Sequence, residues 1–259
     1  MIVVERQSRL QQIVAQRGMA DVETLAAELG VSSSTIRRDL EALEQQGLVK
    51  RTHGGVVWVG EKTPAGAARP YAFDQRMGYR NESKLAIARA ARHLVQPGQT
   101  VLIDGGTTTF YLANELLSAG QPLQLVTNSL PIANLFLNDE SVELILTGGL
   151  MYPRYGVLLG PQAEETIGTI HTKTLFLSVA GIHEGAMYNQ NVLLVNAERQ
   201  MMRQSQEVVL LADSSKFGQQ ALARLCDLSE VDVVVTDAGI EAGHREMIER
   251  AGCRVIVAE

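Results

Sequence analysis

The chain has 259 residues, of which 46% are hydrophobic and 20% charged, so it has enough apolar side chains to build the cores of two ordinary domains. No apolar run approaches the roughly 18 to 20 residues that span a bilayer, and no signal-peptide pattern begins the chain, so we expect a cytoplasmic protein without a membrane partner. A net charge of −6 argues against a protein that binds nucleic acid with its whole surface, although one domain can still be locally basic.

Three short helices are predicted in the first part of the chain. Apolar residues with helical spacing predict the first helix over residues 6–16. Asp21 offers an N-cap carboxylate for a second helix, which ends at Gly30. A third helix, extending to about Gln46, follows the hydroxyl-rich residues 32–35. The turn between the second and third helices is only about three residues long, which is typical of a helix-turn-helix pair.

The third helix has one apolar and one polar face. Ile36, Leu40 and Leu43 recur with helical spacing and would face inward. Hydroxyl groups on the other face can reach phosphates or base edges, and an arginine can bridge guanine with two hydrogen bonds. The residues of this helix that we predict to contact DNA are Ser33, Ser34, Thr35, Arg37 and Arg38.

Residues 48–58 predict a wing, that is, two short strands around a Gly-Gly turn. Lys50 and Arg51 would lie along the phosphates, and His53 in the turn is included among the predicted DNA contacts. Residues 1–58 contain seven Lys and Arg and seven Asp and Glu, so the segment is neutral and the prediction rests on where the charges lie. The alternative is a small docking domain whose charges are simply solvated.

Two blocks carry a resemblance to a known family. The sequence Thr-Ile-Arg-Arg-Asp-Leu at residues 35–40 and the sequence Arg-Thr-His-Gly-Gly at residues 51–55 closely resemble the DNA-binding domain of the DeoR family of bacterial regulators. The resemblance covers essentially all of residues 6–58. It implies that residues 1–58 form a winged helix-turn-helix domain that binds double-stranded operator DNA.

Beyond this domain the sequence predicts a linker and then an α/β domain. Residues 59–82 are interrupted by proline and glycine and read as a linker and entry segment. In residues 83–259, short strands rich in Val, Ile and Leu alternate with helix-length segments, which predicts a mostly parallel sheet covered on both faces. The predicted strands are residues 100–103, 123–127, 142–146, 174–179, 208–211, 231–235 and 254–258.

Polar and glycine-rich residues follow five of these strands. In a parallel sheet, ligands bind beyond the carboxyl ends of the strands, so we expect these residues to share one crevice. The first strand ends in Asp-Gly-Gly-Thr-Thr-Thr before a helix, where glycines, hydroxyls and a helix N-terminus can cradle a phosphate. The predicted ligand-binding residues are Asp104, Gly105, Gly106, Thr107, Thr108, Thr109, Asn128, Gly148, Gly149, Gly181 and Lys216.

The same blocks resemble the effector domain of the DeoR family, which is related in fold to ribose-5-phosphate isomerase and glucosamine-6-phosphate deaminase. The resemblance implies a phosphorylated sugar or a similar metabolite as effector. One stretch departs from it, because many members read roughly Thr-Pro-Asn-Leu-Glu-Glu-Ala where this chain has amides and aliphatics in residues 188–199. No ligand role is assigned to any position there.

The main alternative function is a sugar-phosphate isomerase or deaminase that carries a DNA-binding domain. Asp104 and Asp213 are the candidates for the general base of such an enzyme, but an aspartate before a glycine-rich turn commonly organises the loop instead. Neither aspartate lies in an obvious catalytic signature, and the five histidines lack metal-ligand spacing, so we expect no catalytic residue, no metal and no cofactor. The sequence thus predicts a metabolite-controlled repressor of a carbohydrate-utilisation operon, associated with the nucleoid and assembled as a homo-oligomer, either a dimer or a tetramer.

Overall fold

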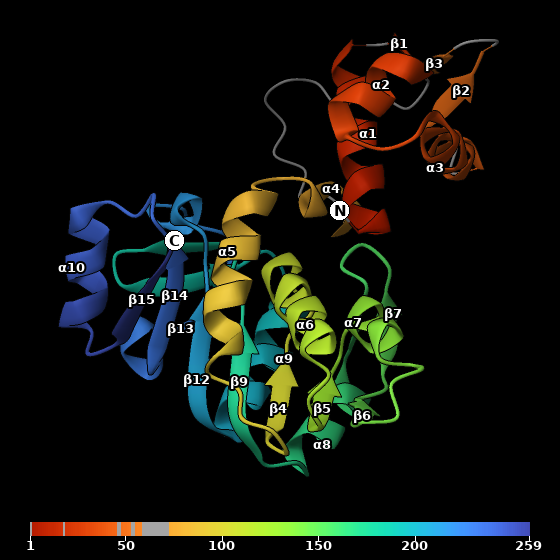
Figure 1. Ribbon diagram of the computed structural model, residues 1–259. Helices are drawn as coiled ribbons and strands as arrows, with labels where there is room; N and C mark the ends of the chain where they lie inside the picture. Colours follow the sequence, from red (N-terminus) through yellow and green to blue (C-terminus); the bar gives the residue numbers. More distant parts are fainter. Residues whose placement is uncertain (1, 18, 46–47, 53–54, 59–72) are drawn as a thin grey trace. The chain divides into compact units, whose positions relative to one another are not determined.

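A computed structural model describes residues 2–17, 19–45, 48–52, 55–58 and 73–259 of the chain (Figure 1). It divides the chain into two compact units, Met1–Asn81 and Glu82–Glu259. Residues 59–72, most of the predicted linker, lie outside the described residues, as does His53 in the predicted wing turn. The predicted division at residues 58 and 82 remains an expectation.

The first unit contains the three predicted helices, which are α1 (Val3–Arg17), α2 (Val22–Leu29) and α3 (Ser33–Gln45). The Asp21 carboxylate accepts a hydrogen bond from the backbone N–H of Thr24 at 2.7 Å, and this bond lowers the pKa of Asp21 below its usual range. Gly30 ends α2 in the left-handed conformation, with φ at +65°. The apolar faces of the helices meet in one core, built around Leu10, Val14, Leu25, Ile36, Leu40 and Leu43.

A small antiparallel sheet forms the wing. Its strands are ordered β1 (Met19–Asp21), β3 (Gly55–Trp58) and β2 (Val49–Arg51). The pairing of β2 with β3 agrees with the expected hairpin. Strand β1 was not expected, because three residues between two helices carry too little alternation to be recognised.

Side-chain hydrogen bonds connect helix α1 to α3 and to the last residues of the first unit. Asp39 of α3 is only 2% exposed, and it accepts hydrogen bonds from the Arg6 guanidinium and from Gln7 Nε2. On the other side, helix α4 (Phe73–Met77) packs on α1, and the N–H of Gly78 donates to Ser8 Oγ at 3.1 Å. Asn81 closes the unit by bonding to Glu5 and Arg9.

The second unit is built on a seven-stranded, fully parallel sheet, which confirms the predicted mostly parallel α/β fold. The strand order is β15, β14, β12, β9, β4, β5 and β6. Their bounds are β4 (Thr100–Ile103), β5 (Leu123–Thr127), β6 (Val142–Leu146), β9 (Thr172–Leu177), β12 (Ser205–Leu211), β14 (Val233–Asp237) and β15 (Arg254–Ala258).

Helices cover both faces of this sheet, with α5 and α6 in front of it and α9 behind it in the view of Figure 1. Such cover explains the uninterrupted apolar strands, because both faces of each central strand are buried. Leu102, Leu175 and Leu210 on neighbouring strands are fully buried. The helices are α5 (Asn81–Arg92), α6 (Thr107–Ala119), α7 (Leu130–Leu135), α8 (Pro161–Gly168), α9 (Val192–Arg203) and α10 (Ala242–Arg250), with one-turn helices η1 (Ser214–Lys216) and η2 (Leu228–Glu230).

Two small antiparallel sheets complete the second unit. One contains β10 (Gly181–His183), β11 (Ala186–Asn189) and β13 (Ala223–Asp227), and the other pairs β7 (Leu150–Tyr152) with β8 (Val157–Leu159). The sequence analysis did not predict these short strands. None of the described helices is both long enough and apolar enough to cross a membrane.

Candidate DNA-binding surface and effector site

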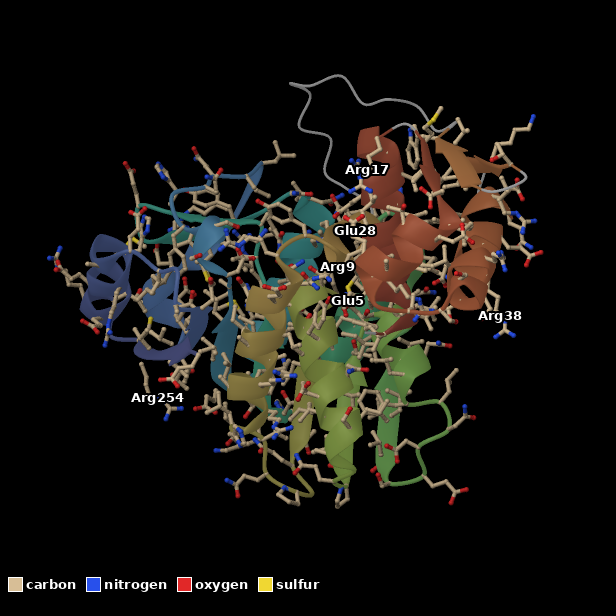
Figure 2. The ribbon with its side chains drawn as sticks, turned by 45° about the horizontal axis from the view of Figure 1, so that its top comes forward. Glu5, Arg9, Arg17, Glu28, Arg38 and Arg254 are labelled. Atoms are coloured by element: carbon tan, nitrogen blue, oxygen red, sulfur yellow. The ribbon has the colours of Figure 1, made fainter. Side chains whose placement is uncertain are left out.

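Helix α3 separates packing residues from exposed residues. Ile36, Leu40 and Leu43 are buried against the core, as expected. Arg37 and Arg38 are exposed, and Figure 2 shows the Arg38 side chain extending away from α3. Asp39 follows these arginines but points inward to Arg6. The arginines are therefore held on the outer face by a buried residue next to them.

The hydroxyl groups at the start of α3 form a small cluster. Ser32 Oγ lies 2.8 Å from Ser34 Oγ and 2.9 Å from Thr35 Oγ1, and it also accepts from the N–H of Thr35 at 3.3 Å. Ser32 thus organises the first turn, a role that leaves the predicted contacts Ser33, Ser34 and Thr35 together at the helix N-terminus. This is the end of a recognition helix that usually faces base edges.

Two of the predicted DNA-binding arginines have acidic partners. Arg37 Nη2 lies 3.6 Å from Glu23 Oε1, and Arg51 Nε lies 2.7 Å from Glu44 Oε2. The backbone N–H of Arg51 also donates to Glu44 at 2.8 Å, and this bond is the main cause that keeps the pKa of Glu44 below its usual range. The described residues place no carboxylate within ion-pair distance of Arg38, so its charge is available to a ligand.

A groove of about 390 Å³ lies between the helices and the wing. Arg37 and Glu23 line it from α3 and α2, and Arg51 and Thr52 line it from the wing. Lys50 is exposed beside Arg51 on β2. Of the predicted DNA contacts, Arg37 of the helix and Arg51 of the wing therefore border one concave surface of the first unit.

In the second unit, the predicted ligand residues gather at one edge of the sheet. Strands β12, β9, β4, β5 and β6 are direct neighbours, so their carboxyl ends lie side by side. Side-chain bonds tie the ends together, since Thr127 Oγ1 donates to the carbonyl of Ile103 at 2.7 Å and the N–H of Ser178 donates to Asp104 at 2.8 Å.

Asp104 organises the turn between β4 and α6. Its Oδ1 accepts from the N–H of Gly106 at 3.0 Å and from Thr109 Oγ1 at 2.6 Å, and its Oδ2 accepts from the N–H and hydroxyl of Ser178. Burial raises the pKa of Asp104 even though these bonds favour the charged form. Both oxygens are used by the protein, as expected for an aspartate that organises a loop.

The two glycines after Asp104 are required by packing. A Cβ on Gly105 would meet the side chain of Val157, and a Cβ on Gly106 would meet the hydroxyl of Ser178. These glycines were predicted because they let a backbone approach an anion. The structure adds that neighbouring strand ends occupy the space where their side chains would be.

The N-terminus of α6 has no side-chain cap, because Gly106 occupies the N-cap position. Its first three N–H groups have no partner within the helix, so they can bind an anion. Thr107 and Thr108 in this turn are almost fully buried, and no hydrogen bond of their hydroxyls is recorded among the described residues. This uncapped turn is the best match to the predicted phosphate cradle.

The remaining predicted ligand residues lie at the other strand ends. Gly148 and Gly149 follow β6 with positive φ angles of 73° and 110°, and a Cβ on Gly149 would come within 2.7 Å of the Leu159 carbonyl oxygen. Gly181 begins β10, against the backbone of Gln219. Lys216 ends the one-turn helix η1 after β12. No group of three His, Cys, Asp or Glu side chains that could hold a metal occurs within the described ranges.

The sequence analysis missed Glu198 of α9. This residue is only 5% exposed, and its Oε1 accepts a hydrogen bond from Asn189 Nδ2 at 2.6 Å. Burial and the nearby charge of Asp104 raise its pKa to about 8. A signal was present in the divergent segment, since Glu198 lies three residues from both Val195 and Met201 on the buried stripe of α9.

Comparison with known families identifies both units. Residues 6–62 match the family described as the DeoR-like helix-turn-helix domain, and residues 80–238 match the DeoR C terminal sensor domain. The two matches cover the described candidate sites, from the start of α3 to the loop that holds Lys216.

Several curated proteins are similar over nearly their whole length. The HTH-type transcriptional regulator GlpR of Haloferax volcanii is 36% identical, covering 99% of this chain and 98% of its own. A protein of Escherichia coli O157:H7, provisionally named the aga operon transcriptional repressor, is 34% identical over 98% of this chain and 93% of its own. The HTH-type transcriptional regulator UlaR of Shigella dysenteriae is 29% identical, with 99% coverage of both chains.

Among solved structures, the ribose 5-phosphate isomerase A of Methanocaldococcus jannaschii matches with a TM-score of 0.39 and 17% identity, over 53% of this chain and 54% of that one. The eIF2B delta subunit of Chaetomium thermophilum matches with a TM-score of 0.45 and 12% identity, over 60% and 55% of the two chains.

Proposed function

The chain belongs to the DeoR family of DNA-binding transcriptional regulators, and on that premise we propose that it represses a carbohydrate-utilisation operon under the control of a phosphorylated sugar. The observation that supports control by a phosphorylated sugar is the uncapped N-terminus of α6, which lies at the edge where five strand ends meet. The names of the similar proteins, which include an aga operon repressor, support the carbohydrate assignment.

On the DNA side, the N-terminal turn of α3 enters the major groove with Ser33, Ser34 and Thr35 near base edges. Arg38 is the main base or phosphate contact, because it is exposed and free of any acidic partner in the described residues. Arg37, Lys50 and Arg51 contact the phosphate backbone of the DNA. On binding, Arg37 releases Glu23 and Arg51 releases Glu44, and each arginine pairs with a phosphate instead. His53 remains a predicted contact of the wing turn.

On the effector side, the phosphate binds the free N–H groups of α6 and the Thr107 and Thr108 hydroxyls, and Lys216 adds a point charge. Asn128, Gly148, Gly149 and Gly181 line the same edge. A single winged domain buries too little surface for tight operator binding, so the regulator acts as a homo-oligomer on paired half-sites. The effector changes operator affinity through its different affinity for the DNA-bound and free states.

The enzyme alternative receives less support from the site. Both Asp104 oxygens are saturated by protein donors, so this carboxylate is not placed to take a proton from a substrate. Asp213 Oδ1 accepts from the N–H of Ser215 and so caps η1. Each aspartate therefore has a structural role that accounts for its position.

A salt-titrated gel-shift assay on DNA upstream of neighbouring sugar-utilisation genes tests the proposal. Arg38→Ala should weaken operator binding about tenfold to a hundredfold and lower the salt slope by about one. The matched control is Arg254→Ala, which removes an exposed arginine from β15 of the second unit (Figure 2). Equal affinities for both variants would contradict the assignment of α3.

The proposed phosphate site at α6 is tested with Thr107→Glu, which places a carboxylate where the phosphate should bind. Thermal shifts are measured with inorganic phosphate and a panel of sugar phosphates, since a specific ligand raises the melting temperature by mass action. The wild type and Thr107→Ser should respond to the same compounds, and Thr107→Glu should not. An undiminished response in a folded Thr107→Glu protein would rule out the α6 site.

A further inference from the structure

Strand β6 forms one edge of the seven-stranded sheet and is paired on one side only (Figure 1). Its neighbour is β5, and within the described ranges no strand pairs with its other side. The N–H of Thr147 donates to the carbonyl of Thr127 at 3.1 Å, so the backbone groups of alternate residues, counted back from Thr147, face β5. The N–H and C=O groups of Val142, Leu144 and Leu146 therefore point outward, where a further strand could bond to them.

The side chains along this edge are apolar and exposed. Ile145 and Leu146 of β6 are each 37% exposed, and Leu150 and Met151 of β7 are 72% and 43% exposed. A contiguous group of exposed apolar side chains commonly marks a protein–protein contact. Edge strands that stay free usually carry lysine, proline or a bulge, whereas β6 has neither residue and its register with β5 is regular throughout.

The opposite edge of the same sheet is protected. Strand β15 begins with the exposed Arg254, and its apolar side chains are half-buried or buried. Helix α10 packs on this strand. A cation on an edge strand disfavours pairing with another strand, because the charge would have to leave water. The two edges therefore differ, and β6 is the one suited to a contact.

The chemistry of β6 indicates what covers it. The partner has to supply a strand for the outward backbone groups and apolar side chains for Ile145 and Leu146. A second copy of β6 supplies both, because two identical strands can pair antiparallel about a two-fold axis. With Ile145 on the axis, Leu144 lies opposite Leu146 of the other copy, and Glu143 lies opposite Thr147. The charged residue of β6 then does not face its own copy, so no like charges oppose each other.

We propose that the second unit forms a two-fold dimer in which the β6 strands of two copies pair antiparallel and join their sheets into one. The inference rests on the proposed function in one respect, namely that the regulator acts as a homo-oligomer, and it adds the surface through which two copies associate. Gly148 and Gly149, two of the predicted ligand residues, connect β6 to β7. An effector bound at these glycines would therefore contact the chain directly beside the dimer interface.

Disulfide cross-linking of the full chain tests the register. In the proposed pairing the two Ile145 residues form a non-hydrogen-bonded pair with Cα atoms about 4.5 Å apart, a distance that a disulfide can span. The natural cysteines, Cys226 and Cys253, are buried. Under mild oxidation most of the Ile145→Cys protein should therefore run as a covalent dimer on a non-reducing gel. Arg254→Cys, on the opposite edge, is the matched control and should run as the wild type does.

Analytical ultracentrifugation measures the association itself. Ile145→Lys brings two ammonium groups together at the two-fold axis, so it should weaken the association of the β6 edges at least about a hundredfold. At a concentration at which the wild type is fully assembled, the variant should have half of the wild-type mass. Leu222→Lys adds the same charge at an exposed leucine before β13 and should keep the wild-type mass. If Ile145→Lys does not fold, the cross-linking result decides alone.

The outcomes separate the inference from the proposed function. A wild-type oligomer whose mass is unchanged in Ile145→Lys, together with no covalent dimer of Ile145→Cys, overturns the β6 interface but leaves the homo-oligomer intact. A wild type that stays monomeric at every concentration measured, with and without operator DNA, overturns the homo-oligomer and the inference with it.

Discussion

At the scale of single residues, the second unit depends on polar groups that are buried next to the sheet edge. Asp104 was recognised from the sequence because it precedes a Gly-Gly-Thr turn. Glu198 was not recognised, because its neighbours in the chain are aliphatics and amides and its partner Asn189 lies on another element. A buried carboxyl group becomes visible only when the helix face is known, and that face depends on tertiary packing.

The raised pKa of Glu198 makes a prediction about stability. Its pKa lies at about 8 in the folded protein, against an ordinary value of 4.5, so the folded state binds the proton more tightly than the unfolded state. The free energy of unfolding should therefore fall as the pH rises from about 4.5 to about 8. Because one pKa unit corresponds to about 1.4 kcal/mol, the total loss should be a few kcal/mol.

Urea unfolding of the wild type and of Glu198→Gln across this pH range measures the effect. The variant should show a flatter pH dependence, although Asp104, whose pKa is also raised, keeps a slope of the same sign. Glu246→Gln, with its exposed side chain, should follow the wild type. Parallel curves for the wild type and Glu198→Gln would show that Glu198 is ionised at the same pH in both states.

At the scale of elements, all seven strands of the parallel sheet were predicted, four of them with the observed bounds, whereas the short antiparallel strands were not predicted. The strands at residues 100–103, 123–127, 142–146 and 254–258 have the predicted bounds, because each is a short run rich in Val, Ile and Leu, the composition expected of parallel strands. Strand β12 begins three residues before its predicted start, with the polar sequence Ser-Gln-Glu. Strands β1 and β7 have only three residues, too few to show an alternating pattern; β1 pairs with the distant strand β3, and β7 pairs with β8 in a local hairpin.

Helices α1 and α3 are joined by a bond that the sequence analysis did not foresee. Removing the carboxyl group in Asp39→Ala leaves the Arg6 guanidinium, which is 12% exposed, without its partner. Loss of one member of a buried pair typically costs about 3–5 kcal/mol. We therefore expect the first unit to unfold at a clearly lower temperature and operator binding to weaken with it.

Thermal unfolding followed by circular dichroism measures this cost. The double variant Arg6→Met with Asp39→Leu should recover most of the stability, because no unpaired charge then remains buried. The exposed pair of Arg17 and Glu28 supplies the control, since Glu28→Ala should change the free energy of unfolding by less than about 1 kcal/mol (Figure 2). If the free energy of unfolding of Asp39→Ala also fell by less than about 1 kcal/mol, the structural role of the bond between Arg6 and Asp39 would be contradicted.

At the scale of the whole molecule, the boundary between the units falls within a helix. Helix α5 begins at Asn81, the last residue of the first unit, and continues into the second. Asn81 bonds to Glu5 and Arg9 in the first unit, whereas Ser83 Oγ donates to Asp237 in the second at 3.1 Å. Asp237 also accepts from the N–H of Ser214 at 2.6 Å, in the loop that contains Lys216.

This arrangement predicts that α5 carries the effector signal along the chain. Ser83→Ala should leave operator affinity and effector affinity within about threefold of the wild type, yet reduce the factor by which one ligand changes the affinity for the other. Gel shifts with and without effector give that factor. Ser118→Ala, on the exposed end of α6, is the control. An unchanged factor in Ser83→Ala would show that coupling does not depend on this bond.

The acidic partners of Arg37 and Arg51 have a consequence for the search for the operator. A bacterial chromosome offers on the order of 10⁶ or more competing sites, and a strongly cationic protein would be bound non-specifically to these sites rather than to its operator. Glu23 and Glu44 lie within ion-pair distance of these arginines, so a phosphate at either proposed DNA contact would compete with an intramolecular carboxylate. We expect random DNA to gain little from that exchange, whereas an operator would add base contacts to it. We expect a regulator built in this way to control its promoter at a low copy number per cell.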